Sequence, residues 1–252
     1  MALAVCLVPP GRAAILGPTY AEHARVARIA GHQVTETATV EDLGSADLAI
    51  VVNPNNPDGR VVAKEMLLAI ADQLRQRGGL LIVDEAFMDA GPNAASLGDA
   101  IEAGGIIVLR SFGKFYGLPG LRLSFALTSE VIAARLAASL GPWPVSGAAL
   151  DIGMAALADK TWREATRRSL AQSAGRLDAM LTKAKFEIVG GTTLFRLARS
   201  SQASEVFQHL GRAGILTRRF AEQKSWLRFG LPGSETEWER FGAALASFAE
   251  RS

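Results

Sequence analysis

Short apolar runs, each followed by glycine, proline or polar residues, divide the first half of the chain. Four of them predict buried strands, Ala13–Leu16, Leu48–Val52, Leu80–Val83 and Ile106–Leu109. Alternating apolar and polar positions predict two more, Gln33–Thr39 and Arg122–Leu127. Helical spacing predicts helices over Ala21–Ala30 and Val62–Arg77. This alternation of strand and helix favours an α/β fold, a three-layer, mostly parallel sheet with helices on both faces.

The second half of the chain changes character and is mainly helical at first. The pattern predicts helices over Ser129–Leu140, Ser146–Ala158 and Trp162–Ala184. Short segments follow, with strands expected at Phe186–Val189, Thr193–Leu197, Ile215–Arg219 and Ser225–Phe229, and helices at Ser204–Ala213 and Glu235–Glu250. We therefore expect residues 1–160 to form a large α/β domain, and residues 161–252 to form a connecting helix and a small α+β domain.

Composition excludes several classes of function. The 252 residues carry a formal net charge of +2, and basic residues are not clustered, so nucleic-acid binding has no support. The three histidines, His23, His32 and His209, lie far apart and show no metal-ligand spacing. No stretch has the length and apolarity of a membrane span, and Met1–Val8 lacks the basic start of a signal peptide. With Cys6 as the single cysteine, we expect a cytoplasmic protein.

A lysine, Lys114, stands in a glycine-rich turn between two expected strands. A phosphate-binding loop of the Walker type has the pattern Gly-x-x-x-x-Gly-Lys-Ser/Thr, but no first glycine precedes Lys114 at the required distance and Phe115 follows the lysine. The Ser111-x-x-Lys114 spacing also occurs in penicillin-recognising enzymes, but their partner motifs are absent. A reactive amine and a solvent-exposed surface lysine both remain open at this point.

Polar residues follow three apolar strands, and carboxyl ends of parallel strands meet at one edge of a sheet. Asn53, Asp84 and Ser111 with Lys114 would then share one crevice. Asp84 could cap the next helix or pair with an arginine. It could also face a protonated ring nitrogen, and that chemistry suits pyridoxal phosphate, which needs an amine for its aldehyde, an acid at its ring nitrogen and donors for its phosphate.

Four motifs together resemble the fold type I pyridoxal-phosphate enzymes of the aminotransferase class I/II family: Asn53-Pro-Asn-Asn-Pro-Asp-Gly59, Asp84-Glu-Ala-Phe87, Ser111-Phe-Gly-Lys114 and Gly120-Leu-Arg122. The resemblance implies that Lys114 binds the cofactor aldehyde and Asp84 its ring nitrogen. It places Asn53 at the phenolic oxygen and beside the substrate, Ser111 and Arg122 at the phosphate, and Tyr20 against the ring. Arg228 would hold the substrate carboxylate, with Arg218 and Arg219 as alternatives. Tyr20 fits a core position equally well.

The chain resembles two branches of the family, which catalyse different reactions. Phe87 stands where many histidinol-phosphate aminotransferases have tyrosine, and this resembles the threonine-phosphate decarboxylases of cobalamin biosynthesis. The resemblance thus implies decarboxylation of L-threonine O-3-phosphate to aminopropanol phosphate. The alternative is an aminotransferase of the histidinol-phosphate type. In both cases the partner is a small amino acid phosphate.

The family has an N-terminal segment, including a turn that donates backbone N–H groups to the cofactor phosphate, and Met1–Val8 resembles the rest of the helix after that turn. If the 252 residues are the whole protein, we expect weak or absent activity and an uncovered sheet edge near Leu121–Leu127. The missing segment also favours an alternative, in which the chain is a non-catalytic remnant of such an enzyme. The resemblance also implies a homodimer.

Overall fold

The computed structural model describes residues 1–91 and 93–249 and divides the chain into two compact units. The first unit comprises Met1–Asn56 and Arg60–Asp159, and the second comprises Pro57–Gly59 and Lys160–Ser252. The chain therefore passes into the second unit once for three residues and again at residue 160. The sequence pattern did not indicate the first of these passages.

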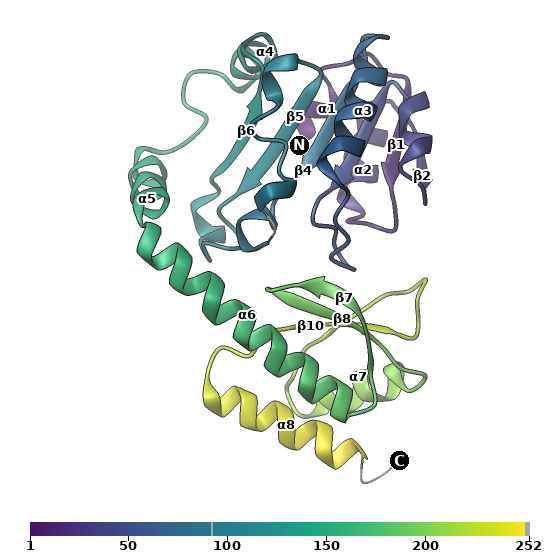
Figure 1. The fold of residues 1–252 in the computed structure, drawn as a ribbon, viewed down its shortest axis with the longest axis vertical. Helices are drawn as coiled ribbons and strands as arrows, with labels where there is room; N and C mark the ends of the chain where they lie inside the picture. The colour runs from purple at the N-terminus through teal and green to yellow at the C-terminus, as the bar shows by residue number, and fades with distance from the viewer. Residues whose placement is uncertain (92, 250–252) are drawn as a thin grey trace. The chain divides into compact units, whose positions relative to one another are not determined.

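The first unit is built on a six-stranded sheet in the order β2-β1-β3-β4-β5-β6 (Figure 1). Its strands are β1 (Arg12–Leu16), β2 (Gln33–Thr37), β3 (Leu48–Val52), β4 (Leu80–Asp84), β5 (Ile106–Ser111) and β6 (Ser124–Thr128). All neighbours pair in parallel except β5 and β6, which are antiparallel. The prediction of a mostly parallel α/β sheet is confirmed.

Both faces of this sheet are buried, because alternate strand residues enter two separate cores. Leu81 and Val83 pack on the face covered by α3 (Lys64–Arg75), whereas Leu80 and Ile82 pack on the other face. That second face is covered by α1 (Ala2–Val5), α2 (Glu22–Ile29) and α4 (Glu130–Leu140). Burial on both faces explains why the central strands β1, β3 and β4 are continuous apolar runs.

Two details of the first unit differ from the sequence expectation. Arg122 is not the first residue of β6 but ends a short 3-10 turn, η5 (Pro119–Leu121), in a left-handed conformation with φ of 52°. The helix expected within Met1–Val8 is limited to four residues, Ala2–Val5. The edge strand β6, expected to be uncovered, has no further strand beside it among the described residues, and Phe125 on it is 37% exposed.

The second unit begins with the long helix α6 (Lys160–Lys183) and contains an antiparallel sheet in the order β7-β8-β10-β9. These strands are β7 (Glu187–Thr192), β8 (Phe195–Arg199), β9 (Arg218–Arg219) and β10 (Trp226–Gly230). Helices α6, α7 (Ala203–Arg212) and α8 (Glu235–Ala249) form one core with the sheet, in which Leu227 and Phe229 are buried. Glu250, expected to belong to the last helix, lies outside the described residues. The last helix of the first unit along the chain is α5 (Gly147–Ala158).

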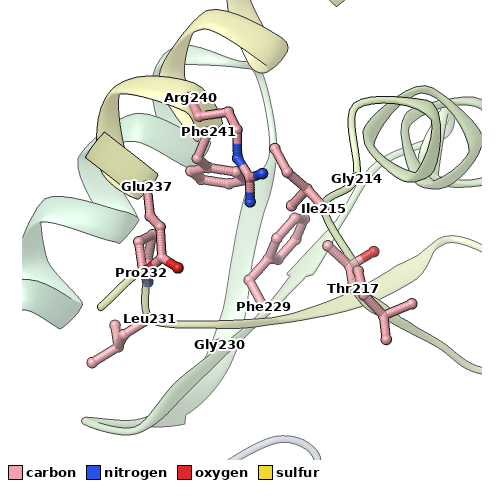
Figure 2. A pocket seen from close by; sticks show the side chains of 11 residues that line it. Gly214, Ile215, Thr217, Phe229, Gly230, Leu231, Pro232, Glu237, Arg240 and Phe241 are labelled. Carbon is pink, nitrogen blue, oxygen red and sulfur yellow. The ribbon is translucent and has the colours of Figure 1, made fainter. Parts of the chain in front are cut away.

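The second unit has a hollow of about 240 Å³ beside α8 (Figure 2). Its walls include Phe229, Phe241 and Arg240. Glu237 also lines it, but its Oε2 accepts hydrogen bonds from the backbone N–H groups of Gly233 and Ser234 at the start of α8. This carboxylate therefore caps a helix.

Within residues 1–91 and 93–249, no helix combines the length and apolar character needed to cross a bilayer.

Candidate active site

The strand order reverses between β1 and β3, since β2 lies on one side of β1 and β3 on the other. Ligands of open parallel sheets bind beyond the carboxyl ends of the strands at such a reversal. The loops that leave β1 and β3 meet here, because the Thr19 hydroxyl donates to Asn55 Oδ1 at 2.6 Å and Asn55 Nδ2 donates to the Pro18 carbonyl at 2.9 Å. The candidate site lies at this edge of the first unit.

Asn53 and Asp84 are brought together by the backbone of neighbouring strands. The Asn53 N–H donates to the Asp84 carbonyl at 2.9 Å, directly beyond the register pair of β3 and β4. The Asn53 side chain is fully buried and forms two bonds with Val62, accepting from its N–H at 2.9 Å and donating to its carbonyl at 3.2 Å. Its amide keeps a second hydrogen for another acceptor.

The partner of Asp84 is a histidine, and neither a helix cap nor an arginine explains this carboxylate. Nε2 of His23 lies 3.0 Å from Asp84 Oδ2, and the His23 side chain is 4% exposed. Neither ring nitrogen of His23 forms an aligned hydrogen bond. The other carboxylate oxygen, Oδ1, accepts from the Ala86 N–H at 3.0 Å and shapes the turn after β4. The Asp84 side chain is 19% exposed, so its carboxylate has a histidine on one side and can still accept a hydrogen bond from a ring N–H of a ligand.

Tyr20 stands over the same histidine, and its ring meets the His23 ring edge-on with centroids 5.5 Å apart. It is 51% exposed, so it is not the core residue that the sequence left open. His23 was not among the residues that the sequence pattern singled out. The available signal was the Tyr20-x-x-His23 spacing just before and at the start of α2, where the His23 N–H donates to the Tyr20 carbonyl at 3.1 Å.

Lys114 lies in the loop that joins β5 to β6 and is exposed. Its Nζ stands 5.6 Å from the centroid of the Phe87 ring, in the loop after Asp84. Within the described part of the chain, Lys114 has no acidic partner. An amine held over an aromatic ring, without a carboxylate to neutralise it, is available to bind an aldehyde.

Ser111 and Arg122 stand at the two ends of this loop. Ser111, the last residue of β5, pairs in register with Ser124 of β6, and its hydroxyl accepts from the Gly113 N–H at 3.1 Å. Arg122 is exposed, and its guanidinium makes one long bond, 3.5 Å, to the Pro119 carbonyl. The loop that carries Lys114 therefore begins and ends beside two polar residues, and the Arg122 guanidinium keeps N–H groups that could bind an anion.

A buried ion pair connects the two strands that carry the acid and the loop. Glu85, next to Asp84, is fully buried, and Arg110, next to Ser111, places Nε 3.2 Å from Glu85 Oε2. Glu85 also accepts from the Ser96 hydroxyl at 2.7 Å and the Leu97 N–H at 2.8 Å. Burial raises the pKa of Glu85, while these donors and Arg110 oppose the rise. The pair fixes the ends of β4 and β5 against each other.

Arg228, expected at the substrate carboxylate, belongs to the second unit and lies on β10. It is paired in register with Arg218 of β9, and its guanidinium stacks over the Phe195 ring at 5.1 Å. Burial, and then the positive charge of Arg218, lower the pKa of Arg228. Arg219 points to the other face of the sheet, where its guanidinium lies over Phe207. Of the two alternatives, Arg218 shares the face of Arg228.

The residues present fit pyridoxal phosphate: a free amine at Lys114, an acid supported by His23 at Asp84, and polar groups at Ser111 and Arg122. With the α/β fold, this set defines a pyridoxal-phosphate enzyme. The family model described as "Aminotransferase class I and II" matches residues 1–245. The chain belongs to that family, and pyridoxal phosphate is its cofactor.

Three known proteins show what this chain is similar to within the family. The chain is 44% identical over 243 residues to the Threonine-phosphate decarboxylase of Pseudomonas aeruginosa, covering 95% of this chain and 73% of that protein. It is 33% identical to a Histidinol-phosphate aminotransferase of Mycobacterium bovis, covering 96% of this chain and 68% of that protein. The solved structure of the histidinol-phosphate aminotransferase from Clostridium acetobutylicum has the same fold, with a TM-score of 0.90 and 24% identity over 100% of this chain and 81% of that one.

Proposed function

We propose that the chain decarboxylates L-threonine O-3-phosphate to aminopropanol phosphate, the reaction of cobalamin biosynthesis. The single observation that carries the proposal is the 44% identity with the Pseudomonas aeruginosa decarboxylase over 95% of the chain. Phe87, whose ring centroid lies 5.6 Å from Lys114 Nζ, is consistent with it, because the ring offers that amine a π face but no hydroxyl.

Each residue has a defined task in this reaction. Bound pyridoxal phosphate supplies an electron sink next to the substrate Cα. Asp84, supported by His23, holds a proton on the ring nitrogen and so maintains that sink. The second amide hydrogen of Asn53 serves the phenolic oxygen and the adjacent substrate, Ser111 and Arg122 bind the cofactor phosphate, and Tyr20 covers the ring.

Lys114 serves as the proton donor in the last step of the reaction. The bond between Cα and the substrate carboxylate breaks, CO₂ leaves, and the electron pair stays at Cα. Lys114 Nζ then delivers a proton to Cα, and the amine product departs. Arg228 binds the carboxylate before it leaves, and the paired guanidinium of Arg218 provides a second positive charge for an amino acid phosphate.

Two measurements test the cofactor assignment and the reaction. Borohydride treatment of the chain with pyridoxal phosphate should fix the cofactor to the peptide that contains Lys114. Lys114→Ala should prevent this, while Lys183→Ala, an exposed lysine of α6, should not. L-Threonine O-3-phosphate should then release CO₂ without a 2-oxo acid. No fixed cofactor in the parent chain would contradict the proposal and favour weak or absent activity.

A second candidate function is transamination of histidinol phosphate, which the 33% identity with the Mycobacterium bovis protein favours. In that reaction Lys114 would move a proton between Cα and the cofactor carbon. A strict need for a 2-oxo acid, with no CO₂ released, would establish this alternative. A chain that fixes cofactor but performs neither reaction would contradict both.

We also propose a homodimer and a cytoplasmic location. Helix α5 and the segment before it expose large apolar side chains of the first unit, among them Trp143 at 90% and Met154 at 65%. Such a concentration marks a protein interface, and a second copy is the partner that the family resemblance implies. Light scattering should give twice the mass of one chain, and Trp143→Ser with Met154→Ser should shift it to one. The exposed free thiol of Cys6 is compatible with a reducing compartment.

A further inference from the structure

The hollow of about 240 Å³ beside α8 lies wholly within the second unit (Figure 2). Three segments line it: the turn after α7, the end of β10 with the loop that follows it, and the first half of α8. Pockets for drug-sized ligands usually measure about 300–1,000 Å³, so this volume suits a smaller molecule of the size of a metabolite. None of the lining residues has a task in the proposed decarboxylation.

Arg240 brings to this hollow a positive charge that has no partner in the described part of the chain. Within residues 1–91 and 93–249 its guanidinium forms neither an ion pair nor a hydrogen bond. Glu237, one helical turn earlier, is held toward the start of α8, because its Oε2 accepts from the N–H groups of Gly233 and Ser234 at 2.6 and 3.2 Å. Figure 2 shows both side chains extending from α8 toward the hollow. The two opposite charges therefore line one space without forming an ion pair.

Thr217 brings a buried hydroxyl to the same hollow. The residue is 8% exposed, and its Oγ1 has no hydrogen-bond partner among the described residues. Thr217 stands two positions before Arg219, whose guanidinium lies over Phe207 of α7, so the alternation of an extended chain directs Thr217 to the same, helix-covered face. A buried hydroxyl without a partner costs free energy, which a ligand in the hollow would recover. Rotation of this hydroxyl toward a ligand breaks no existing hydrogen bond.

We propose that the hollow binds a small α-amino acid with a branched apolar side chain. Its carboxylate pairs with the Arg240 guanidinium, whose parallel N–H groups match the two carboxylate oxygens. Its ammonium group donates to Oε1 of Glu237, the oxygen that the start of α8 leaves open. The apolar side chain packs on the rings of Phe229 and Phe241. A simple anion fits less well, because the Glu237 carboxylate repels it.

L-Valine is the probe for this site. It is titrated into the full chain, and binding is followed by NMR at the amide signals of Gly214 and Gly230, two glycines of the wall. Two analogues separate its charges, since isovalerate lacks the ammonium group and isobutylamine lacks the carboxylate. Arg240→Met removes the positive charge of the hollow. Arg212→Met is the matched control, because Arg212 is an exposed arginine of α7 that does not line the hollow.

Valine should shift both glycine signals saturably. Both analogues should bind at least about tenfold more weakly than valine, and valine should bind Arg240→Met at least about tenfold more weakly than the parent. Thr217→Val should weaken valine binding about threefold. It should leave the melting temperature of the ligand-free chain unchanged or higher, because the hydroxyl that it removes has no partner.

The absence of a saturable shift in the parent chain would overturn the proposal, as would equal valine affinity in Arg240→Met and Arg212→Met. Isovalerate that binds as tightly as valine would overturn the assigned class of ligand. Arg228→Gln locates the ligand: an unchanged affinity supports the hollow, whereas affinity lost there and kept in Arg240→Met would place valine at the proposed substrate site instead. Because no cofactor is added, failure here leaves the proposed decarboxylation untouched.

Discussion

The ion pair between Arg110 and Glu85 offers the sharpest test of how the site is held. We consider Arg110→Met, which keeps most of the apolar volume but removes the charge. Glu85 would remain fully buried with two donors, Ser96 and the Leu97 N–H. At 3.2 Å and an effective dielectric constant of about 20, the lost attraction is about 5 kcal/mol.

The net loss in the free energy of unfolding is smaller than this attraction. The variant no longer has to desolvate a guanidinium on folding, and Glu85 keeps its two donors. Breaking one partner of a buried pair typically costs about 3–5 kcal/mol, and we expect the lower end, about 3 kcal/mol, at pH 7. Burial already raises the pKa of Glu85, so ionising it opposes folding, and the stability gained from its neutral form is lost as pH rises through the folded-state pKa. Without Arg110 that pKa rises further. The penalty should therefore shrink as pH falls from 7 toward 4.5.

Urea unfolding of four proteins at both pH values measures this: the parent, Arg110→Met, Glu85→Gln and the double variant. In the Glu85→Gln background the buried carboxylate is gone, while Arg110 still pairs with Asp89 at 3.1 Å, so Arg110→Met should cost clearly less there than in the parent. The reasoning is refuted if Arg110→Met costs the same with Glu85 and with Gln at position 85. A penalty that does not change with pH would also refute it.

Three further outcomes are expected. His23→Leu should weaken cofactor binding about tenfold or more, because Asp84 loses the imidazole 3.0 Å from its carboxylate, and equal affinity in a fluorescence titration would contradict the role given to His23. Arg228→Gln should raise the substrate KM far more than Arg219→Gln, which alters the opposite face of the sheet, and similar KM changes would argue against Arg228 as the carboxylate ligand. Ile82→Ala in a fully buried strand should cost about 2–5 kcal/mol in urea unfolding, and a loss below about 1 kcal/mol would speak against the two-sided core.

Most of the fold could be predicted because local pattern and burial agree in it. Leu48–Val52 is a strand with the bounds that its apolar run indicates, since both of its faces are covered. The arrangement of Asn53 beside Asp84 also followed from the rule that parallel strands end at one edge, and the backbone bond between them confirms it. The roles assigned to these side chains remain predictions.

What the pattern missed depends on contacts between distant segments. His23 reads as an ordinary helix residue until Asp84 is placed 3.0 Å away, 61 positions along the chain. Arg122 reads as the start of an alternating strand, but closing the loop from β5 required a left-handed residue there. Gly59 reads as the end of a turn, and only the position of Gly191 shows why no side chain fits.

The antiparallel pairing of β5 with β6 has a consequence for how such sites can change. Ser111 and Ser124 face each other in register, so residues 112–123 form a closed excursion whose two ends meet at one point of the sheet. The amine of Lys114 and the guanidinium of Arg122 both sit on that excursion. Replacing residues 112–123 as one block, joined at the Ser111–Ser124 pair, would exchange both groups together and leave the register of the other strands unchanged. Cleavage of the chain within residues 112–123 would release both groups from their fixed spacing.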